Sequence, residues 1–145
     1  MKLALLSACL LLGLAACNKS NAADKLPGTY ELDKTANLPM FVEMAKKDAK
    51  LDDAKANEAG QKALEATTMS LDLKADGTFV FRMGMMGMPA TDENGTWKIE
   101  GDKVVTTTKK DGGKDEVHEG TISGDSLKFT DMGGQKKTFV VTKKK

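Results

Sequence analysis

"MSLDLKADGTFVF", residues 69–81, carries the clearest structural signal in the chain. Residues 69–74 alternate strictly between apolar and polar side chains, which is typical of a β-strand with one buried face. Asp76-Gly77 follows, and this dipeptide is a strong signal for a tight hairpin turn. Beyond the turn, Phe79 and Phe81 again share one face. The stretch therefore predicts two antiparallel strands joined by a short turn.

The same combination of glycine turn and alternating run recurs along the chain, mostly in its second half. A motif of glycine, threonine and a large apolar residue lies where four such runs begin, at Gly28-Thr29-Tyr30, Gly77-Thr78-Phe79, Gly95-Thr96-Trp97 and Gly120-Thr121-Ile122. Eight strands are expected, near residues 28–33, 69–75, 78–84, 95–100, 103–109, 116–123, 126–131 and 137–142. This order predicts a mainly β fold, an antiparallel up-and-down barrel whose closure removes exposed sheet edges. An open, half-wrapped sheet is the alternative.

A helical insert is expected between the first two strands, over residues 38–66. The segment is rich in Ala, Lys, Glu and Asp and has no β-branched run. Pro39 suits a first helical turn, and Asn37 is a plausible cap. Gly60 is expected to bend or end the first helix. The apolar stripe is narrow (Met40, Met44 and Leu51), so the insert is expected on the barrel surface or across one end.

The N-terminus has the features of a lipoprotein signal. Met1-Lys2 is a short basic start, and the uncharged apolar run after it is too short to span a bilayer as a stable helix. The run ends in Leu14-Ala15-Ala16-Cys17, which resembles the lipobox of bacterial lipoproteins. This resemblance implies removal of residues 1–16, a diacylglycerol on the Cys17 sulfur and an acyl chain on its new amino group. An ordinary signal peptide with a chance cysteine is the alternative.

The lipobox resemblance also implies a location. Three hydrocarbon chains would anchor the protein to a membrane far more firmly than a single chain does. Asn18 follows the cysteine where aspartate would signal retention in the inner membrane of enterobacteria, so the resemblance implies the outer membrane. Residues 17–25 would be the lipidated cysteine and a short tether. Residues 26–145 would form the barrel domain, facing the periplasm.

Charge and cysteine content exclude several classes of function. The chain has 22 basic and 21 acidic residues, and loss of Lys2 with the signal leaves a formal charge of zero. This balance argues against nucleic-acid binding, which requires a net basic face. Cys9 would leave with the signal and Cys17 would carry lipid, so we expect neither a disulfide nor a zinc-thiolate site.

Four segments together resemble bacterial lipocalin-like lipoproteins. They are "LPGTYELD" (residues 26–33), "LDLKADGTFVF" (71–81), "NGTWKIEGDKV" (94–104) and "GTISGDSLKF" (120–129), with the helical insert between the first two. The resemblance covers most of residues 26–142 and rests mainly on turn and strand chemistry. It implies a small β-barrel without catalytic activity, and it does not specify a ligand.

The inward faces of the expected strands supply the candidates for a ligand pocket. They are Tyr30, Leu71, Leu73, Phe79, Phe81, Trp97, Ile99, Leu127, Phe129 and Phe139. An eight-stranded barrel can hold one small ligand or can be filled by its own side chains, and both arrangements need the same apolar alternation. The functional hypothesis is therefore binding of a small apolar ligand, or docking of an envelope partner.

Catalytic chemistry has little support in the sequence, and no cofactor is expected. A serine-histidine-aspartate relay would have to use His118, which lies between charged neighbours and is expected to be a solvated or rim residue. The acidic pairs Asp92-Glu93 and Asp115-Glu116 are adjacent in sequence, so they are expected to diverge as solvated surface. An enzyme is the weakest alternative.

Four methionines gather in "MGMMGM", residues 83–88: Met83, Met85, Met86 and Met88. Thioether sulfur is a soft ligand, so one alternative is a site for Cu(I). Methionine also fills irregular apolar gaps and is common on surfaces that bind variable partners. The segment continues the face of Phe81 and precedes a polar turn expected at residues 92–95. We therefore favour a mobile apolar flap at a barrel mouth, or plain hairpin packing, over a metal cage.

Overall fold

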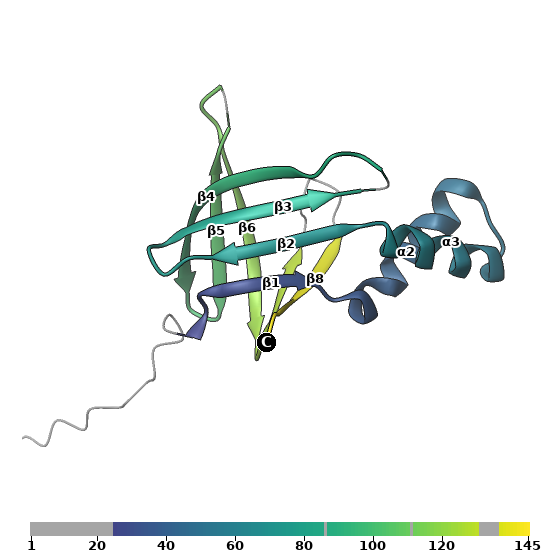
Figure 1. Ribbon diagram of the computed structural model, residues 1–145, viewed down its shortest axis with the longest axis horizontal. Coiled ribbons are helices and arrows are strands. Elements are labelled where there is room, and N and C mark those ends of the chain that lie inside the picture. The colour runs from purple at the N-terminus through teal and green to yellow at the C-terminus, as the bar shows by residue number, and fades with distance from the viewer. Residues whose placement is uncertain (1–24, 86, 111, 131–136) are drawn as a thin grey trace, which may run out of the picture.

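The computed structural model describes residues 25–85, 87–110, 112–130 and 137–145, which form a closed antiparallel barrel with two helices beside it (Figure 1). The strands are β1 (Gly28–Leu32), β2 (Thr68–Leu73), β3 (Thr78–Gly84), β4 (Thr91–Glu100), β5 (Lys103–Lys109), β6 (Asp115–Ser123), β7 (Ser126–Thr130) and β8 (Thr138–Lys143). Each strand pairs with its sequence neighbour, and β8 pairs with β1. The predicted barrel is confirmed, and the open sheet is wrong.

Strand β4 begins at Thr91, four residues before the expected start, so the polar turn expected at residues 92–95 is wrong. The segment is polar because it lies at the end of a hairpin whose outer face is exposed. Arg82 on β3 faces Asp92 on β4 and donates two hydrogen bonds of 2.7 Å to its carboxylate. This cross-strand pairing accommodates the acidic residues in an extended strand.

The helical insert consists of α2 (Lys34–Ala49) and α3 (Asp53–Glu65). The Asp33 carboxylate accepts a hydrogen bond from the Ala36 N–H and caps α2, so the cap expected at Asn37 is wrong. The chain breaks at Lys50, which adopts a left-handed conformation with φ of 50°, and α3 then begins after Asp52. No described helix has both the length and the apolar character of a membrane-spanning helix.

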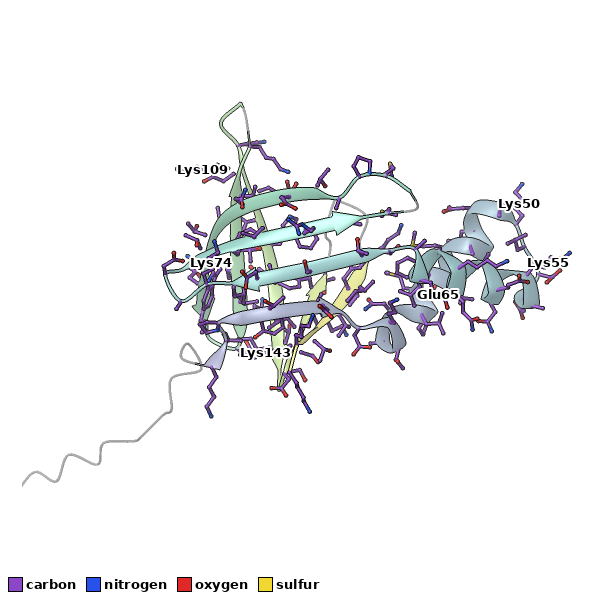
Figure 2. All side chains as sticks on the ribbon, in the orientation of Figure 1. Lys50, Lys55, Glu65, Lys74, Lys109 and Lys143 are labelled. Carbon is purple, nitrogen blue, oxygen red and sulfur yellow. The ribbon has the colours of Figure 1, made fainter. Side chains whose placement is uncertain are left out.

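Gly60 lies inside α3, so the bend expected there is wrong. The glycine allows α3 to pack closely against α2, because a Cβ at this position would lie 2.8 Å from backbone atoms of Val42 on α2. The helices project from one end of the barrel, outside the core, and Lys50 and Lys55 lie at the far end of the pair (Figures 1 and 2). The insert is therefore external, as the narrow apolar stripe predicted.

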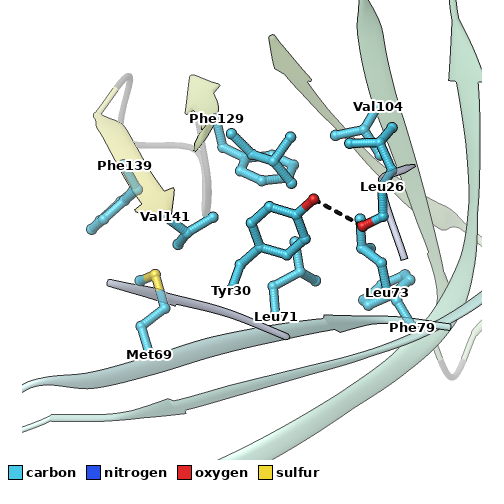
Figure 3. Packing of buried hydrophobic residues seen from close by; sticks show 11 residues of the cluster. Leu26, Tyr30, Met69, Leu71, Leu73, Phe79, Val104, Phe129, Phe139 and Val141 are labelled. Carbon is cyan, nitrogen blue, oxygen red and sulfur yellow. Dashed lines mark hydrogen bonds between the residues drawn. The ribbon is translucent and has the colours of Figure 1, made fainter. Parts of the chain in front are cut away.

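The barrel has one filled end, which we call the closed end, where the turns β2–β3, β4–β5 and β6–β7 lie. Leu26, just before β1, is buried there, and the Tyr30 hydroxyl donates a 2.8 Å hydrogen bond to its carbonyl oxygen (Figure 3). Burial raises the pKa of Tyr30. The opposite end, beside the helices, is the mouth.

Asn37 joins α2 to the barrel. Its side chain is 1% exposed, and its amide nitrogen donates to the Val140 carbonyl at 2.7 Å and to the Asp33 carbonyl at 2.6 Å. Its amide oxygen accepts from the Val140 N–H at 3.0 Å. The side-chain amide thus bonds to the backbone N–H and carbonyl of Val140 on β8, just beyond the end of β1. A further residue of β1 would make bonds of the same kind.

We predict that Asn37→Ala lowers the free energy of unfolding by about 1–3 kcal/mol, because the part-buried N–H of Val140 loses its partner, while the Val140 carbonyl keeps only the bond from the Asp33 N–H. Asn57→Ala, the same change at an exposed position of α3, is the matched control and should stay within about 0.5 kcal/mol of the wild type. Urea denaturation followed by circular dichroism measures both. Equal effects of the two substitutions would contradict this role for Asn37.

Candidate functional site

The barrel interior is packed at the closed end and open at the mouth. Leu73, Val104 and Leu127 fill the closed end and are almost completely buried. Above them, a small cavity of about 20 Å³ lies among ten side chains that include Leu71, Phe79 and Phe129. This space holds about one water molecule. The lower half of the barrel therefore leaves no room for a ligand.

A larger cavity of about 560 Å³ opens at the mouth. It is lined by Met44, Asp48, Met69, Phe81, Met83, Met85, Thr91, Glu93, Glu116, His118, Lys137 and Phe139. Met69, Phe81, Glu93 and His118 also line the small cavity, so they lie between the two spaces. Its volume is in the range of small-molecule sites in proteins.

The ten pocket candidates from the sequence separate into two groups. Tyr30, Leu73, Trp97, Ile99 and Leu127 belong to the packed cluster or lie against it and line neither cavity. Leu71, Phe79 and Phe129 line the small cavity, Phe139 lines the mouth, and Phe81 lines both. The closed half thus follows the packed-core alternative, and the mouth half follows the cavity alternative.

The sequence pattern did not lead us to expect polar residues at the mouth. Glu93 and Glu116 belong to acidic pairs that were expected to diverge as solvated surface. The pairs do diverge, but these two side chains line the mouth cavity instead of the outer surface. Each points into the barrel, while its aspartate neighbour lies on the exposed side. The alternation of strand faces could have placed both glutamates inside the barrel, because Glu93 is in phase with Trp97 and Glu116 is in phase with Ile122.

One lysine bridges the two carboxylates. The Lys110 Nζ lies 2.6 Å from Glu93 Oε1 and 3.1 Å from Glu116 Oε2, so the two carboxylates lie within about 6 Å of each other. His118 Nε2 lies 3.2 Å from Glu116 Oε1, and the histidine side chain is 14% exposed. His118 is thus a rim residue that faces inward.

The bridge perturbs the protonation of its members. The hydrogen bond from Lys110 lowers the pKa of Glu116 below its ordinary value, against a smaller opposing effect of burial, and the charges of Lys110 and His118 lower it further. The bonds to Glu93 and Glu116 raise the pKa of Lys110. Both groups are therefore charged near neutral pH.

Two threonines of β5 lie between the charged rim and the apolar floor. Thr106 and Thr108 line the small cavity and are buried. The Thr106 hydroxyl donates a long hydrogen bond of 3.4 Å to the His118 backbone carbonyl. The Thr108 side chain, 7% exposed, makes no hydrogen bond with another described residue. Its side chain thus forms part of the wall of the small cavity.

The methionine segment divides at the mouth. Met83 and Met85 line the large cavity, Met88 is 65% exposed, and Met86 lies outside the described residues. Met44 from α2 and Met69 from β2 join the first two in the cavity wall. Within the described ranges, no group of three or more His, Cys, Asp or Glu side chains is arranged to hold a metal ion. The Cu(I) hypothesis for residues 83–88 stays a prediction.

Comparison with protein families agrees with this architecture. A family model described as "Lipocalin-like domain" matches residues 50–129, which is more than half of the chain. The chain belongs to this lipocalin-like family. No curated protein sequence matches it.

Three solved structures are similar to this lipocalin-like chain. The Cpx pathway activator NlpE from Escherichia coli is 29% identical, with a TM-score of 0.39, over 49% of this chain and 37% of that chain. The chain therefore spans well under half the length of that protein. The REP1-NXSQ fatty acid transporter is 12% identical, with a TM-score of 0.42, over 84% and 98% of the two chains. A mutant of the fluorescent protein UnaG is 16% identical, with a TM-score of 0.40, over 83% and 96%.

The pKa of Glu116 yields a pH-dependent prediction. Because this pKa is lowered on folding, the ion pair contributes stability above the ordinary glutamate pKa of about 4.3, and that contribution is lost as pH falls through the folded value. Lys110→Met should raise the pKa of Glu116 and remove this acid-dependent loss. Carboxyl NMR titration and urea denaturation between about pH 3 and pH 7 measure the two effects.

Lys109→Met is the control for this experiment, since Lys109 is exposed and makes no ion pair with another described residue. It should leave the pKa of Glu116 unchanged. A Glu116 titration that is the same in Lys110→Met and in the wild type would show that the bridge is not maintained in solution.

Proposed function

We propose that the protein is a lipid-anchored, non-enzymatic lipoprotein of the bacterial envelope, whose barrel binds a small apolar ligand at its mouth. The cavity of about 560 Å³ is the observation that carries this proposal. Six of its twelve lining residues are apolar, namely Phe81, Phe139 and four methionines, and the other six are polar. Ligand sites characteristically combine apolar walls with placed polar groups.

The packed floor limits the size of the ligand. Only about 20 Å³ of space lies below the mouth cavity, so a long hydrocarbon chain has no path toward the closed end. The ligand would instead lie between the methionine side chains and Phe139. Methionine suits such a wall because its flexible thioether adapts to ligand shape.

The arrangement around His118 supports binding over catalysis. A histidine that activates a nucleophile forms a hydrogen bond to its hydroxyl or thiol. The described partner of the His118 ring is the Glu116 carboxylate, while the Thr106 hydroxyl bonds to the backbone of His118. No described hydroxyl or thiol is bonded to the His118 ring.

The other hypotheses from the sequence have less support from the geometry. Soft-metal binding would use Met83 and Met85 in the cavity, but Met88 is directed into solvent. Docking of an envelope partner would need an exposed apolar patch. Among the described residues, Met88 and Val117 are the large apolar side chains with high exposure.

The proposed anchor gives the mouth a direction. Residues 1–24, including the lipobox and Cys17, lie outside the described residues. Leu26 enters the barrel at the closed end, so an anchor at Cys17 would hold that end toward the membrane. The mouth would then face the periplasm, where it is accessible to a dissolved ligand.

Dye binding tests the mouth as the ligand site. N-phenyl-1-naphthylamine, a neutral apolar dye, should bind the purified domain with increased fluorescence. Thr91→Trp places a large ring in the cavity and should weaken binding about tenfold, equivalent to ~1.4 kcal/mol of lost contact. Thr96→Trp makes the same change on the outer face of β4 and should bind as the wild type does.

Failure of the dye and of other small apolar probes to bind would overturn the proposed function. Equal losses in Thr91→Trp and Thr96→Trp would place the site elsewhere. Circular dichroism of both variants shows whether each remains folded.

Lipidation is tested separately in cells. Mass spectrometry should find a mature protein that starts at a triacylated Cys17 and partitions into detergent. Cys17→Ser should release the domain from the membrane fraction, because the attachment atom is gone. Cys9→Ser, within the proposed signal, is the control and should stay membrane-bound. An unmodified Cys17 would contradict the anchor and the outer-membrane location.

A further inference from the structure

We propose that the ligand of the mouth carries an ammonium group, which binds between Glu93 and Glu116 while the apolar part of the ligand lies against Phe81 and Phe139. This inference rests on the proposed function and adds the chemical class of the ligand. It follows from the position of Lys110, from the charges of the cavity wall and from the position of Thr108 opposite Glu116.

Lys110 shows that an ammonium group fits between the two carboxylates. Its Nζ lies 2.6 Å from Glu93 and 3.1 Å from Glu116, both within charge-assisted hydrogen-bonding distance. Both glutamates line the large cavity, whereas Lys110 reaches them from just beyond the end of β5. A ligand ammonium that enters from the cavity side would meet the same carboxylates.

The bridging lysine is exchangeable. Its side chain is 44% exposed, and ion pairs at this exposure contribute little to stability. Replacement of the lysine ammonium by a ligand ammonium exchanges one ion pair for another. The apolar part of the ligand then adds burial against the cavity wall, which favours the exchange. Lys110 would turn outward into solvent.

The charges of the cavity disfavour an acidic ligand. Three carboxylates line the mouth, those of Asp48, Glu93 and Glu116, with Lys137 and His118 as the nitrogen-bearing groups. Arg82 is the only arginine in the sequence, and it lies on the outer face, bound to Asp92 through two hydrogen bonds. The bidentate group best suited to hold a ligand carboxylate is thus directed away from the cavity.

Thr108 offers a further hydroxyl close to the carboxylates. Its side chain is 7% exposed and lines the small cavity below the mouth. It lies opposite Glu116 in the β5–β6 register and makes no hydrogen bond with another described residue. Its hydroxyl therefore remains able to bond to water or to a ligand group that reaches the small cavity. A ligand ammonium has three donors, so it can bond to both glutamates and to the Thr108 hydroxyl.

A head-group series tests the proposal. Octylamine, octan-1-ol and octanoate share one hydrocarbon chain and differ in charge at pH 7. Each is titrated against the bound dye, and NMR titration of the labelled domain locates the contact. We expect octylamine to displace the dye at a concentration about fivefold lower than octan-1-ol, because its ammonium inside the cavity is less screened by solvent than the exposed lysine ammonium that it displaces. Octanoate should be the weakest of the three.

Variants of the charged residues separate recognition from a structural role. Lys110→Met removes the resident ammonium and should increase octylamine affinity about fivefold, whereas a purely structural bridge predicts no change in the order of the series. Lys103→Met is the control, because Lys103 forms the same kind of pair with Glu119 on the outside of β5 and β6. Lys103→Met should leave the affinities of all three compounds unchanged.

Neutralisation of the carboxylates completes the test. Glu93→Gln with Glu116→Gln should abolish the preference for octylamine over octan-1-ol, and Glu119→Gln should preserve it. Retained octan-1-ol binding shows that the double variant still has a formed cavity. If the double variant cannot bind octan-1-ol, the change in octylamine affinity of Lys110→Met decides whether the ammonium proposal holds.

The outcomes distinguish this inference from the proposed function. Binding of the series with octanoate equal to or tighter than octylamine overturns the ammonium proposal and leaves the apolar site intact. The same holds if Lys110→Met leaves octylamine affinity unchanged. Failure of all three compounds and of the dye to bind overturns both.

Discussion

The pairing of β1 with β8 is the constraint on which the rest of the structure depends. β1 has only five residues, and its register with β8 covers three of them, Tyr30 to Leu32. The Asp33 N–H and the Asn37 amide then occupy the backbone groups of Val140 as the chain turns into α2. Closure in this way leaves no strand edge open and gives every strand one face that points inward.

The inward faces change in character along the barrel axis, and this change creates the site. β4 presents Ile99 and Trp97 near the closed end and Glu93 at the mouth. Gly95 lies between Trp97 and Glu93 on the inward face of β4, and a Cβ there would be only 2.6 Å from the Phe79 ring. A Cβ at Gly120 on β6 would likewise be 2.8 Å from the Phe129 ring. The two glycines admit the aromatic rings that form the floor. Above that floor, the same strands carry the charged groups of the mouth.

The strands, their order and their antiparallel pairing were predictable because period-two alternation and glycine turns are local signals. The start of β4 was not predictable, because "TDEN" has the composition of a loop. It becomes a strand only when Arg82 and Lys110 lie across from its carboxylates. Likewise, Gly60 has the composition of a helix break. It lies inside α3 because another helix packs against it.

The sequence by itself determined an antiparallel barrel, an external helical insert and which apolar residues face inward, because each of these depends on spacing along one segment. Only the tertiary structure decided where packing ends and the cavity begins, since that depends on side chains from α2, β3, β6 and β8 that are far apart in the chain. It also decided that Glu93, Glu116 and Lys110 meet. Ion pairing is a property of positions in space, and each of these residues is, in sequence, an ordinary surface charge.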